Sequence, residues 1–176
     1  RDQLTQYVVS LSTALKEHGK VLSITIPAID SYNAFDIEGM EEHIEYFLLM
    51  GYDYYGSWSA EAGPVAPFYS QPTWGSYSVE GSIDNYLTKG MDASQMVLVV
   101  PYYGASWEVE STDLPSPRKK FLKSVTFREV KDSYPDENPT LEPTSKSAYF
   151  NLDTEGGKTQ IWFDNVEALS YKYDFV

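Results

Sequence analysis

A nearly continuous apolar run, Tyr46–Met50, constrains the fold of this chain more than any other feature of its sequence. An unbroken apolar run is typical of a parallel strand that is buried on both faces. The run leads into Gly51 and then into Asp53, which lies among aromatic residues that continue to Trp58. Because α/β enzymes keep their chemistry at the carboxyl ends of parallel strands, the sequence predicts a functional site here. The alternative is a strand that simply ends in an aromatic loop.

Helical and strand patterns alternate along most of the chain, as in a mostly parallel sheet with helices packed on it. The first helix follows a possible cap at Asp2, and Gly19 and Gly90 are predicted to end two helices as C-terminal stops. The predicted elements, in order, are helix 2–19, strand 21–27, short helix 36–43, strand 46–53, a helix around 83–87, strand 96–101, strand 159–163 and helix 165–173. The predicted fold class is therefore α/β.

The pattern changes between residues 106 and 157, where prolines interrupt short apolar pieces. Proline is excluded from the interior of central strands. This region therefore predicts an insertion whose short strands, 125–130 and 148–152, lie outside the main sheet. It contains the basic cluster Arg118-Lys119-Lys120, which is interpreted as solvated surface.

Composition excludes several classes of partner. The chain has 26 acidic and 13 basic residues, and its net charge of -13 repels phosphate backbones and anionic lipid headgroups. We therefore predict no nucleic-acid and no membrane partner. The chain has no cysteine, and neither His18 nor His43 has a second histidine at ligand spacing, so we predict no metal and no cofactor. Since the sequence starts at Arg1 and runs directly into a helical pattern, we expect a piece of a longer protein.

Several segments, in the same order, resemble one known family. The sequence Met50-Gly51-Tyr52-Asp53 resembles the Met-x-Tyr-Asp motif on the sixth barrel strand of glycoside hydrolase family 18, the chitinases and their relatives. Residues 63–69 are similar to the loop after that strand, and residues 82–87 to the helix before strand seven. Residues 99–107 resemble strand seven, and residues 160–169 resemble the stretch that leads into helix seven.

The resemblance implies part of a (β/α)8 TIM barrel, about strands 5 to 7, with an α+β insertion between strand 7 and helix 7. The expected divisions are 1–105 (barrel, helix 4 to strand 7), 106–157 (insertion) and 158–176 (barrel, leading to helix 7). Because such a barrel needs about 250 residues, the missing half is expected from the parent protein or from another chain.

The family's proton donor is a glutamate that ends an Asp-x-x-Asp-x-Asp-x-Glu motif on strand four. This motif does not occur in residues 1–176. Two shorter Asp-x-Glu sequences, 36–38 and 153–155, are interpreted as carboxylates of loops or helix caps. The acid glutamate is therefore expected outside this chain.

By resemblance, Tyr52 and Asp53 are auxiliary catalytic residues. The Tyr52 phenol would hydrogen-bond the acetamido oxygen with which the sugar itself attacks, and Asp53 would place negative charge near the cationic transition state. Met50 would line the floor of this subsite, and Tyr103 would also reach the acetamide. The alternatives are a phenol that caps the strand for Tyr52 and an acceptor of loop amides for Asp53.

Four tryptophans complete the candidate residues. Trp107 and Trp58 are predicted to stack on sugar rings, and Trp74 is balanced between that role and packing in a loop core. Trp162 matches a family position that indicates packing. Many members of the family have arginine where this chain has Ala105, which leaves one polar sugar contact unaccounted for.

Taken together, the resemblance implies a fragment of a chitinase-type hydrolase that cleaves β-1,4-linked N-acetylglucosamine polymers by a retaining, substrate-assisted mechanism. Such a polymer or oligomer is the expected partner, and the expected location is secreted or extracellular. Two alternatives share the fold: an endo-β-N-acetylglucosaminidase or peptidoglycan hydrolase, and a non-catalytic chitinase-like lectin. Without the acid glutamate, this segment alone is predicted to be inactive.

Overall fold

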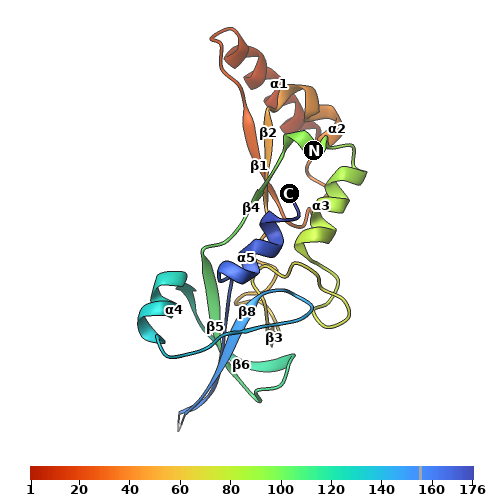
Figure 1. The fold of residues 1–176 in the computed structure, drawn as a ribbon. Coiled ribbons are helices and arrows are strands. Elements are labelled where there is room, and N and C mark those ends of the chain that lie inside the picture. Colours follow the sequence, from red (N-terminus) through yellow and green to blue (C-terminus); the bar gives the residue numbers. More distant parts are fainter. Residues whose placement is uncertain (155) are drawn as a thin grey trace. The chain divides into compact units, whose positions relative to one another are not determined.

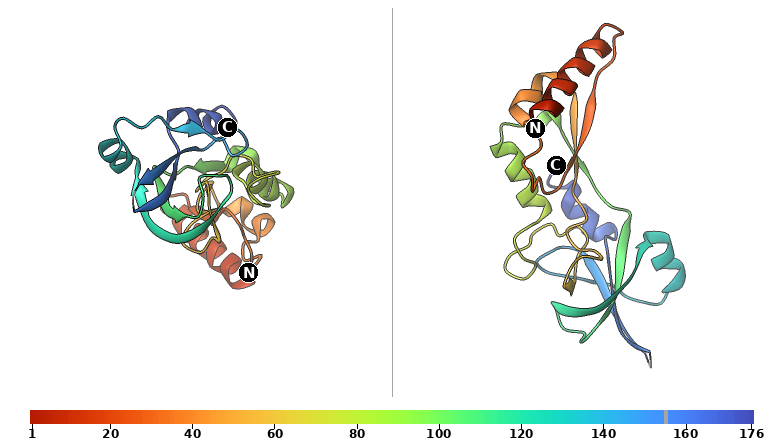
Figure 2. Two further views of the ribbon diagram at one scale, coloured as in Figure 1. Left: turned by 90° about the horizontal axis from the view of Figure 1, so that it is seen from below. Right: turned by 180° about the vertical axis from the view of Figure 1, so that it is seen from behind.

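The computed structural model describes residues 1–154 and 156–176. The chain forms two compact units, one made of residues 1–51 and 80–99 and the other of residues 52–79 and 100–176. Each unit has its own sheet (Figures 1 and 2). None of the helices in the described residues combines the length and hydropathy that a membrane span requires.

The first unit is built on a three-stranded parallel sheet. Strand β2 (Tyr46–Met50) pairs with β1 (Ser23–Pro27) on one side and with β4 (Met96–Val99) on the other. Phe47 and Leu49 are fully buried, whereas Leu48 and Met50, on the other face of β2, are partly buried. The predicted burial thus holds for one face only, because three strands are too few to close around a core of their own.

The helices of the first unit lie beside these strands, with α1 (Asp2–Lys16) running along β1 (Figures 1 and 2). The further helices are α2 (Ile37–Met40), the 3-10 turns η1 (Glu41–His43) and η2 (Ala93–Gln95), and α3 (Val79–Thr88). Gly19 and Gly90 follow α1 and α3 with φ of +63° and +92°, so both predicted helix stops are confirmed. Asp2 is not the cap: the N-cap is Arg1, and Asp2 lies in the first turn, where its charge favours the helix dipole.

The second unit is built on a six-stranded antiparallel sheet in the order β3-β6-β5-β9-β8-β7. Its strands are β3 (Glu61–Ala62), β5 (Tyr103–Val109), β6 (Ser116–Thr126), β7 (Thr140–Leu141), β8 (Ala148–Thr154) and β9 (Gly157–Phe163). Its helices are α4 (Phe127–Ser133) and α5 (Val166–Tyr173), and Asn165 caps α5 by accepting the Ala168 amide at 2.9 Å.

The structure corrects the predicted strand 125–130. Strand β6 ends at Thr126, which caps α4: its hydroxyl accepts the Glu129 amide at 3.1 Å, and the Glu129 carboxylate accepts the Thr126 amide at 2.7 Å. Thr-x-x-Glu is the signature of a capping box, so the sequence did contain the helix signal. The strands of residues 106–157 do lie outside the parallel sheet, as predicted, but their sheet also includes β3 and extends through β5 and β9 beyond these residues. The division at 105/106 and 157/158 stays a prediction.

The two Asp-x-Glu sequences have different outcomes. Asp36 occupies the N-cap position of α2, as predicted, but its carboxylate makes no cap hydrogen bond and instead pairs with Arg1 at 2.5 Å. Asp153 lies within strand β8 rather than in a loop. Glu155 lies outside the described residues.

Three tryptophans form the centre of the second unit's core. Trp74, Trp107 and Trp162 are almost completely buried. Trp74 and Trp162 meet edge to face with ring centroids 4.8 Å apart, and Tyr149 stacks on Trp162 at 4.7 Å. The buried carboxylate of Glu142 accepts a 2.6 Å hydrogen bond from Nε1 of Trp74. The predicted packing role of Trp162 is confirmed, and Trp74 is a core residue.

Candidate functional site

The candidate site begins at Asp53, shortly after β2 ends. Its φ of +63° lies in the left-handed region, which non-glycine residues seldom adopt and which aspartate tolerates better than most. The next amide, that of Tyr54, donates a 3.0 Å hydrogen bond to the Val65 carbonyl and so fixes the backbone here. Backbone conformations of this kind cluster at functional sites. The Asp53 side chain is exposed.

Tyr103, the first residue of β5, holds the Asp53 carboxylate in place. Its hydroxyl donates a 2.6 Å hydrogen bond to Oδ1 of Asp53. Tyr52 meets the Tyr103 ring edge to face, with centroids 5.9 Å apart, and both tyrosines pack against the tryptophan core. Burial raises the pKa of Tyr103 well above its usual range, and the hydrogen bond to Asp53 raises it further. The phenol therefore stays protonated and remains the donor of this hydrogen bond.

A cleft of about 320 Å³ opens beside this pair, within the second unit. One wall comes from the loop after β2 and the other from strands β5 and β6. Both polar and aromatic residues line it, as in sites that bind sugars through hydrogen bonds and ring stacking. The lining residues are Asp53, Tyr55, Gly56, Ser57, Trp58, Val65, Tyr103, Gly104, Ala105, Phe121 and Ser124.

Trp58 is the exposed aromatic side chain of this cleft, with 63% of its surface accessible. Its ring lies across Gly56, where an added Cβ would come within 2.5 Å of a Trp58 ring carbon. Glycine at position 56 is therefore required for this orientation of the indole. An exposed and oriented indole is the arrangement that stacking on a sugar ring needs.

Trp107 does not share this geometry. It is completely buried and packs edge to face against Phe121, with ring centroids 5.8 Å apart. An indole without an exposed face cannot stack on a sugar, so the predicted subsite contact at Trp107 is corrected to a packing role. The prediction was based on the position of Trp107 in the strand-seven motif. The direction of its side chain depends instead on the pairing of β5 with β6 and β9, which is not a local feature.

The other predicted residues are placed as follows. Tyr52 is partly buried beside Tyr103, and Met50 is partly buried at the end of β2, in the first unit. Ala105 lines the cleft, and its small side chain leaves that part of the wall without a charge. The roles assigned to Tyr52, Asp53, Met50 and Tyr103 stay predictions.

Several cleft residues were not among the predicted site residues, notably Tyr55, Phe121 and Ser124. Phe121 and Ser124 lie on β6, which was not predicted as a strand over these residues, and Ser124 reaches the cleft because it pairs with Ala105 across the sheet. Tyr55 lies within the aromatic run itself, so its position was a signal that could have been used. Burial raises the pKa of the Tyr55 phenol, with a further contribution from the charge of Glu61.

The family comparison decides what kind of site this is. The model of the glycosyl hydrolases family 18 matches residues 1–176. The chain belongs to this family.

Relatives of this family 18 chain include Chitinase 1 of Aphanocladium album, which is 33% identical over 112 residues, 61% of this chain and 26% of that protein. A family 18 N-acetylglucosaminidase from Paenibacillus barengoltzii superposes with a TM-score of 0.89 at 21% identity, covering 100% of this chain and 55% of the other. A family 18 chitinase from Cycas revoluta in complex with (GlcNAc)3 superposes with a TM-score of 0.85 at 18% identity, covering 99% and 54%.

The family 18 chain thus has a mixed α/β fold that matches about half the length of these solved structures, which are TIM-barrel enzymes. It spans a smaller share of the fungal chitinase. At these identities the structural likeness shows the fold alone. Which barrel strands the chain supplies stays a prediction.

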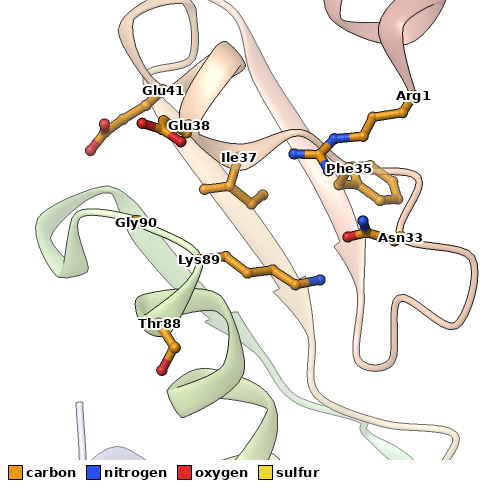
Figure 3. Close-up of a pocket in the computed structure, with 9 residues that line it drawn as sticks. All are labelled: Arg1, Asn33, Phe35, Ile37, Glu38, Glu41, Thr88, Lys89 and Gly90. Atoms are coloured by element: carbon orange, nitrogen blue, oxygen red, sulfur yellow. The ribbon is translucent and has the colours of Figure 1, made fainter.

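A larger cavity in the first unit, of about 520 Å³, offers less chemistry (Figure 3). Its two cationic side chains are already paired, Lys89 with Asp30 at 3.5 Å and Arg1 with Asp36 at 2.5 Å. In the described part of this family 18 chain, no group of three or more histidine, cysteine, aspartate or glutamate side chains is arranged to hold a metal ion.

Proposed function

We propose that the protein to which residues 1–176 belong is a chitinase-type glycoside hydrolase that cleaves β-1,4-linked N-acetylglucosamine polymers with retention of configuration. The observation that carries the proposal is the 2.6 Å hydrogen bond from Tyr103 to Asp53 at the edge of an open cleft that also exposes Trp58. Family membership supports the reaction class. The complex of the Cycas revoluta chitinase with (GlcNAc)3 supports the substrate class.

The proposed reaction is substrate-assisted. The acetamido oxygen of the sugar attacks its own anomeric carbon, the glycosidic bond breaks, and its electron pair goes to the leaving oxygen, which takes a proton from the acid glutamate. A cyclic oxazolinium ion results. Water then opens this ring at the anomeric carbon and returns a proton to the glutamate. Two inversions at one carbon give net retention.

The residues of this chain would supply position and charge rather than the proton. The Tyr52 phenol would hydrogen-bond the acetamido oxygen and fix the attacking geometry, because positioning of reacting groups lowers barriers by several kcal/mol. The Asp53 carboxylate would stabilise the positive charge of the oxazolinium ion. The Tyr103 hydroxyl donates a hydrogen bond to Asp53. The lone pairs of the Tyr103 oxygen therefore stay free to accept a hydrogen bond from the acetamide N–H. Met50 would line the floor of the subsite.

We propose that the acid glutamate lies outside this chain, in the parent protein or in another chain, together with the remaining barrel strands. Two observations support this. The Asp-x-x-Asp-x-Asp-x-Glu motif does not occur in residues 1–176, and β1 and β4 are the edge strands of their sheet among the described residues. Open edges of parallel strands normally pair with further strands. In this proposal the chain supplies about strands 5 to 7.

A polymeric substrate bears on the location. Long N-acetylglucosamine polymers do not cross a cell membrane, so an enzyme that cleaves them works where the polymer is. We therefore propose that the parent protein is secreted or extracellular. The partner in the cleft would be the sugar chain, with Trp58 stacking on one of its rings.

The test uses the full-length protein and three substrates: chitin oligomers, peptidoglycan and N-glycans. We expect cleavage of the chitin oligomers, with the β-anomer as first product in NMR spectra. Preferred cleavage of N-glycans or peptidoglycan would favour an endo-β-N-acetylglucosaminidase or a peptidoglycan hydrolase. The structural similarity to the Paenibacillus barengoltzii N-acetylglucosaminidase is the observation that keeps this alternative open. Binding of oligomers without any cleavage would overturn the enzyme in favour of a lectin.

Two further measurements test the charge role of Asp53 and the absence of the proton donor from residues 1–176. Asp53→Asn should lower kcat by about a hundredfold or more, since it removes charge near the transition state, whereas Asp136→Asn, at an exposed position of the same unit, should not. Residues 1–176 expressed alone should associate or aggregate through their open sheet edges and should not hydrolyse chitin. A soluble, monomeric preparation of this segment that cleaves chitin would show that the proton donor has been misplaced.

A further inference from the structure

Arg118 of the basic cluster is tied to the cleft rather than only solvated. It lies on β6, opposite Val109 of β5. Its guanidinium Nη1 donates a hydrogen bond to the Ser57 carbonyl, and its backbone amide donates one to the Ala60 carbonyl at 3.0 Å. These two carbonyls belong to the loop on either side of Trp58. One residue of the sheet therefore holds both sides of the exposed tryptophan.

The loop itself is a tight turn. The Ser59 amide donates to the Gly56 carbonyl at 3.0 Å, and the Gly56 amide donates to the Ser59 hydroxyl at 3.1 Å. These bonds shape the turn locally, but they do not connect it to a strand. On the side after Trp58, the turn is joined to β6 by the Arg118 amide and by the pairing of Glu61 with Pro117. On the side before Trp58, the Arg118 guanidinium makes the connection, so the direction in which Trp58 points depends on this side chain of β6.

We propose that Arg118 is a positioning residue that fixes the Trp58 indole in the orientation in which it stacks on a sugar ring. This inference rests on the proposed function. Its physical basis is pre-organisation: a side chain that is already ordered loses less entropy when the ligand binds. Guanidinium suits the task because it stays charged and presents several donors in a rigid plane. The neighbouring Lys119 and Lys120 are exposed and serve as matched controls.

The test is a double-mutant cycle in the full-length protein, with affinity for a chitin oligomer as the readout. Arg118→Ala should weaken binding about threefold to tenfold, the range expected for one lost hydrogen bond. It should raise KM with little change in kcat, because the lost contact acts on binding. Arg118→Lys, which keeps a donor, should lose less, and Lys119→Ala and Lys120→Ala should match the parent protein.

The decisive comparison is between the Trp58→Ala variant and the variant that carries both substitutions. If Arg118 acts through Trp58, the variant with both Arg118→Ala and Trp58→Ala should bind no more weakly than Trp58→Ala alone. Additive losses would mean that Arg118 contacts the sugar itself, and the inference would be overturned. An unchanged affinity in Arg118→Ala and in Arg118→Lys would overturn it as well.

A readout without ligand keeps this inference separate from the proposed function. Amide hydrogen exchange of residues 57–60 should be faster in Arg118→Ala than in the parent protein and unchanged in Lys119→Ala. If the parent protein binds no N-acetylglucosamine oligomer, the proposed function fails, and the exchange still decides whether Arg118 holds the loop. Equal exchange rates in all variants would refute the inference.

Discussion

The hydroxyl of Tyr103 donates a 2.6 Å hydrogen bond to Oδ1 of Asp53, although the two residues lie 50 positions apart in the chain. The bond joins the turn after β2 to the first residue of β5. It orients the carboxylate while leaving its second oxygen to the cleft. A hydrogen bond to a charged group is worth about 1.5–3 kcal/mol.

We therefore expect Tyr103→Phe to lower kcat/KM on chitin oligomers by about 10-fold to 150-fold, the factor that corresponds to that free energy. Steady-state kinetics of the full-length protein measure it. Tyr102→Phe is the control, because Tyr102 is exposed and its hydroxyl lies 3.2 Å from the Tyr173 hydroxyl rather than on Asp53. Equal losses in both variants would contradict a specific role of the Asp53 bond.

The tryptophans of the second unit should separate into two classes. Trp58→Ala should weaken oligomer binding about tenfold without lowering stability, since 63% of the side chain is exposed. Trp107→Ala should instead lower the free energy of unfolding by about 3–5 kcal/mol, because it leaves a cavity in the core. Denaturant unfolding and calorimetric titration measure the two effects. Weaker binding with full stability in Trp107→Ala would restore its predicted contact with sugar.

Much of the fold could be predicted because its signals are local. The run Tyr46–Met50 and the glycines Gly19 and Gly90 follow from side-chain period and backbone conformation, and the structure confirms them. The strand β6 was missed because it alternates exposed lysines with few apolar residues, so it has no apolar period of its own. Its place is determined by pairing with β5, which is a long-range relationship.

The candidate site, like the fold, combines residues with a local sequence signal and contacts that depend on long-range strand pairing. The sequence predicts Asp53 and Trp58 because a strand end with a carboxylate and aromatics is a local pattern. It could not predict the bond from Tyr103 to Asp53 or the burial of Trp107, since both depend on which face of β5 points to the core. Arg118 was interpreted as surface for the same reason, and its bond to Ser57 crosses between distant segments.

Stability of the second unit should depend on pH through Glu142. This buried carboxylate accepts hydrogen bonds from Nε1 of Trp74 and the Ser145 amide, both at 2.6 Å, and from the Thr144 amide at 3.1 Å. Burial alone would raise the pKa of Glu142, but these donors lower it on balance. A depressed carboxylate pKa contributes stability above the unfolded value, about 4.3, that is lost as the pH falls through the folded value.

Glu142→Gln should therefore be less stable than the parent protein at neutral pH, by about 1–3 kcal/mol, because it cannot accept the same set of donors. The difference should begin to shrink as the pH falls below the unfolded value of about 4.3, and it should vanish below the lowered pKa of the folded carboxyl, where the parent side chain is protonated too. Urea unfolding at several pH values measures both curves. Glu137→Gln, at an exposed position, should run parallel to the parent protein. Parallel curves for Glu142→Gln would show that its bonds do not depend on charge.

The buried ion pair of Lys172 and Asp164 gives the sharpest test of the packing of α5. The Lys172 side chain is completely buried, and its ammonium group bonds the Asp164 carboxylate, which also accepts the Ser147 hydroxyl at 3.1 Å. Burial raises the pKa of Asp164 and lowers the pKa of Lys172, so each charge depends on the other. Removing one partner leaves an uncompensated buried charge, which costs about 3–5 kcal/mol.

We expect Lys172→Met to lower the free energy of unfolding by about 3–5 kcal/mol at neutral pH and by less in acid. Without the ammonium group, the pKa of Asp164 rises further, so the penalty disappears as the pH falls through that raised value and the carboxyl takes up a proton. The variant with both Lys172→Met and Asp164→Leu should be more stable at neutral pH than Lys172→Met alone, because it buries no charge. Urea unfolding at about pH 8 and pH 5 distinguishes these outcomes. If the double variant were as unstable as the single one at both pH values, the loss would come from packing of the Lys172 stem rather than from an unpaired charge.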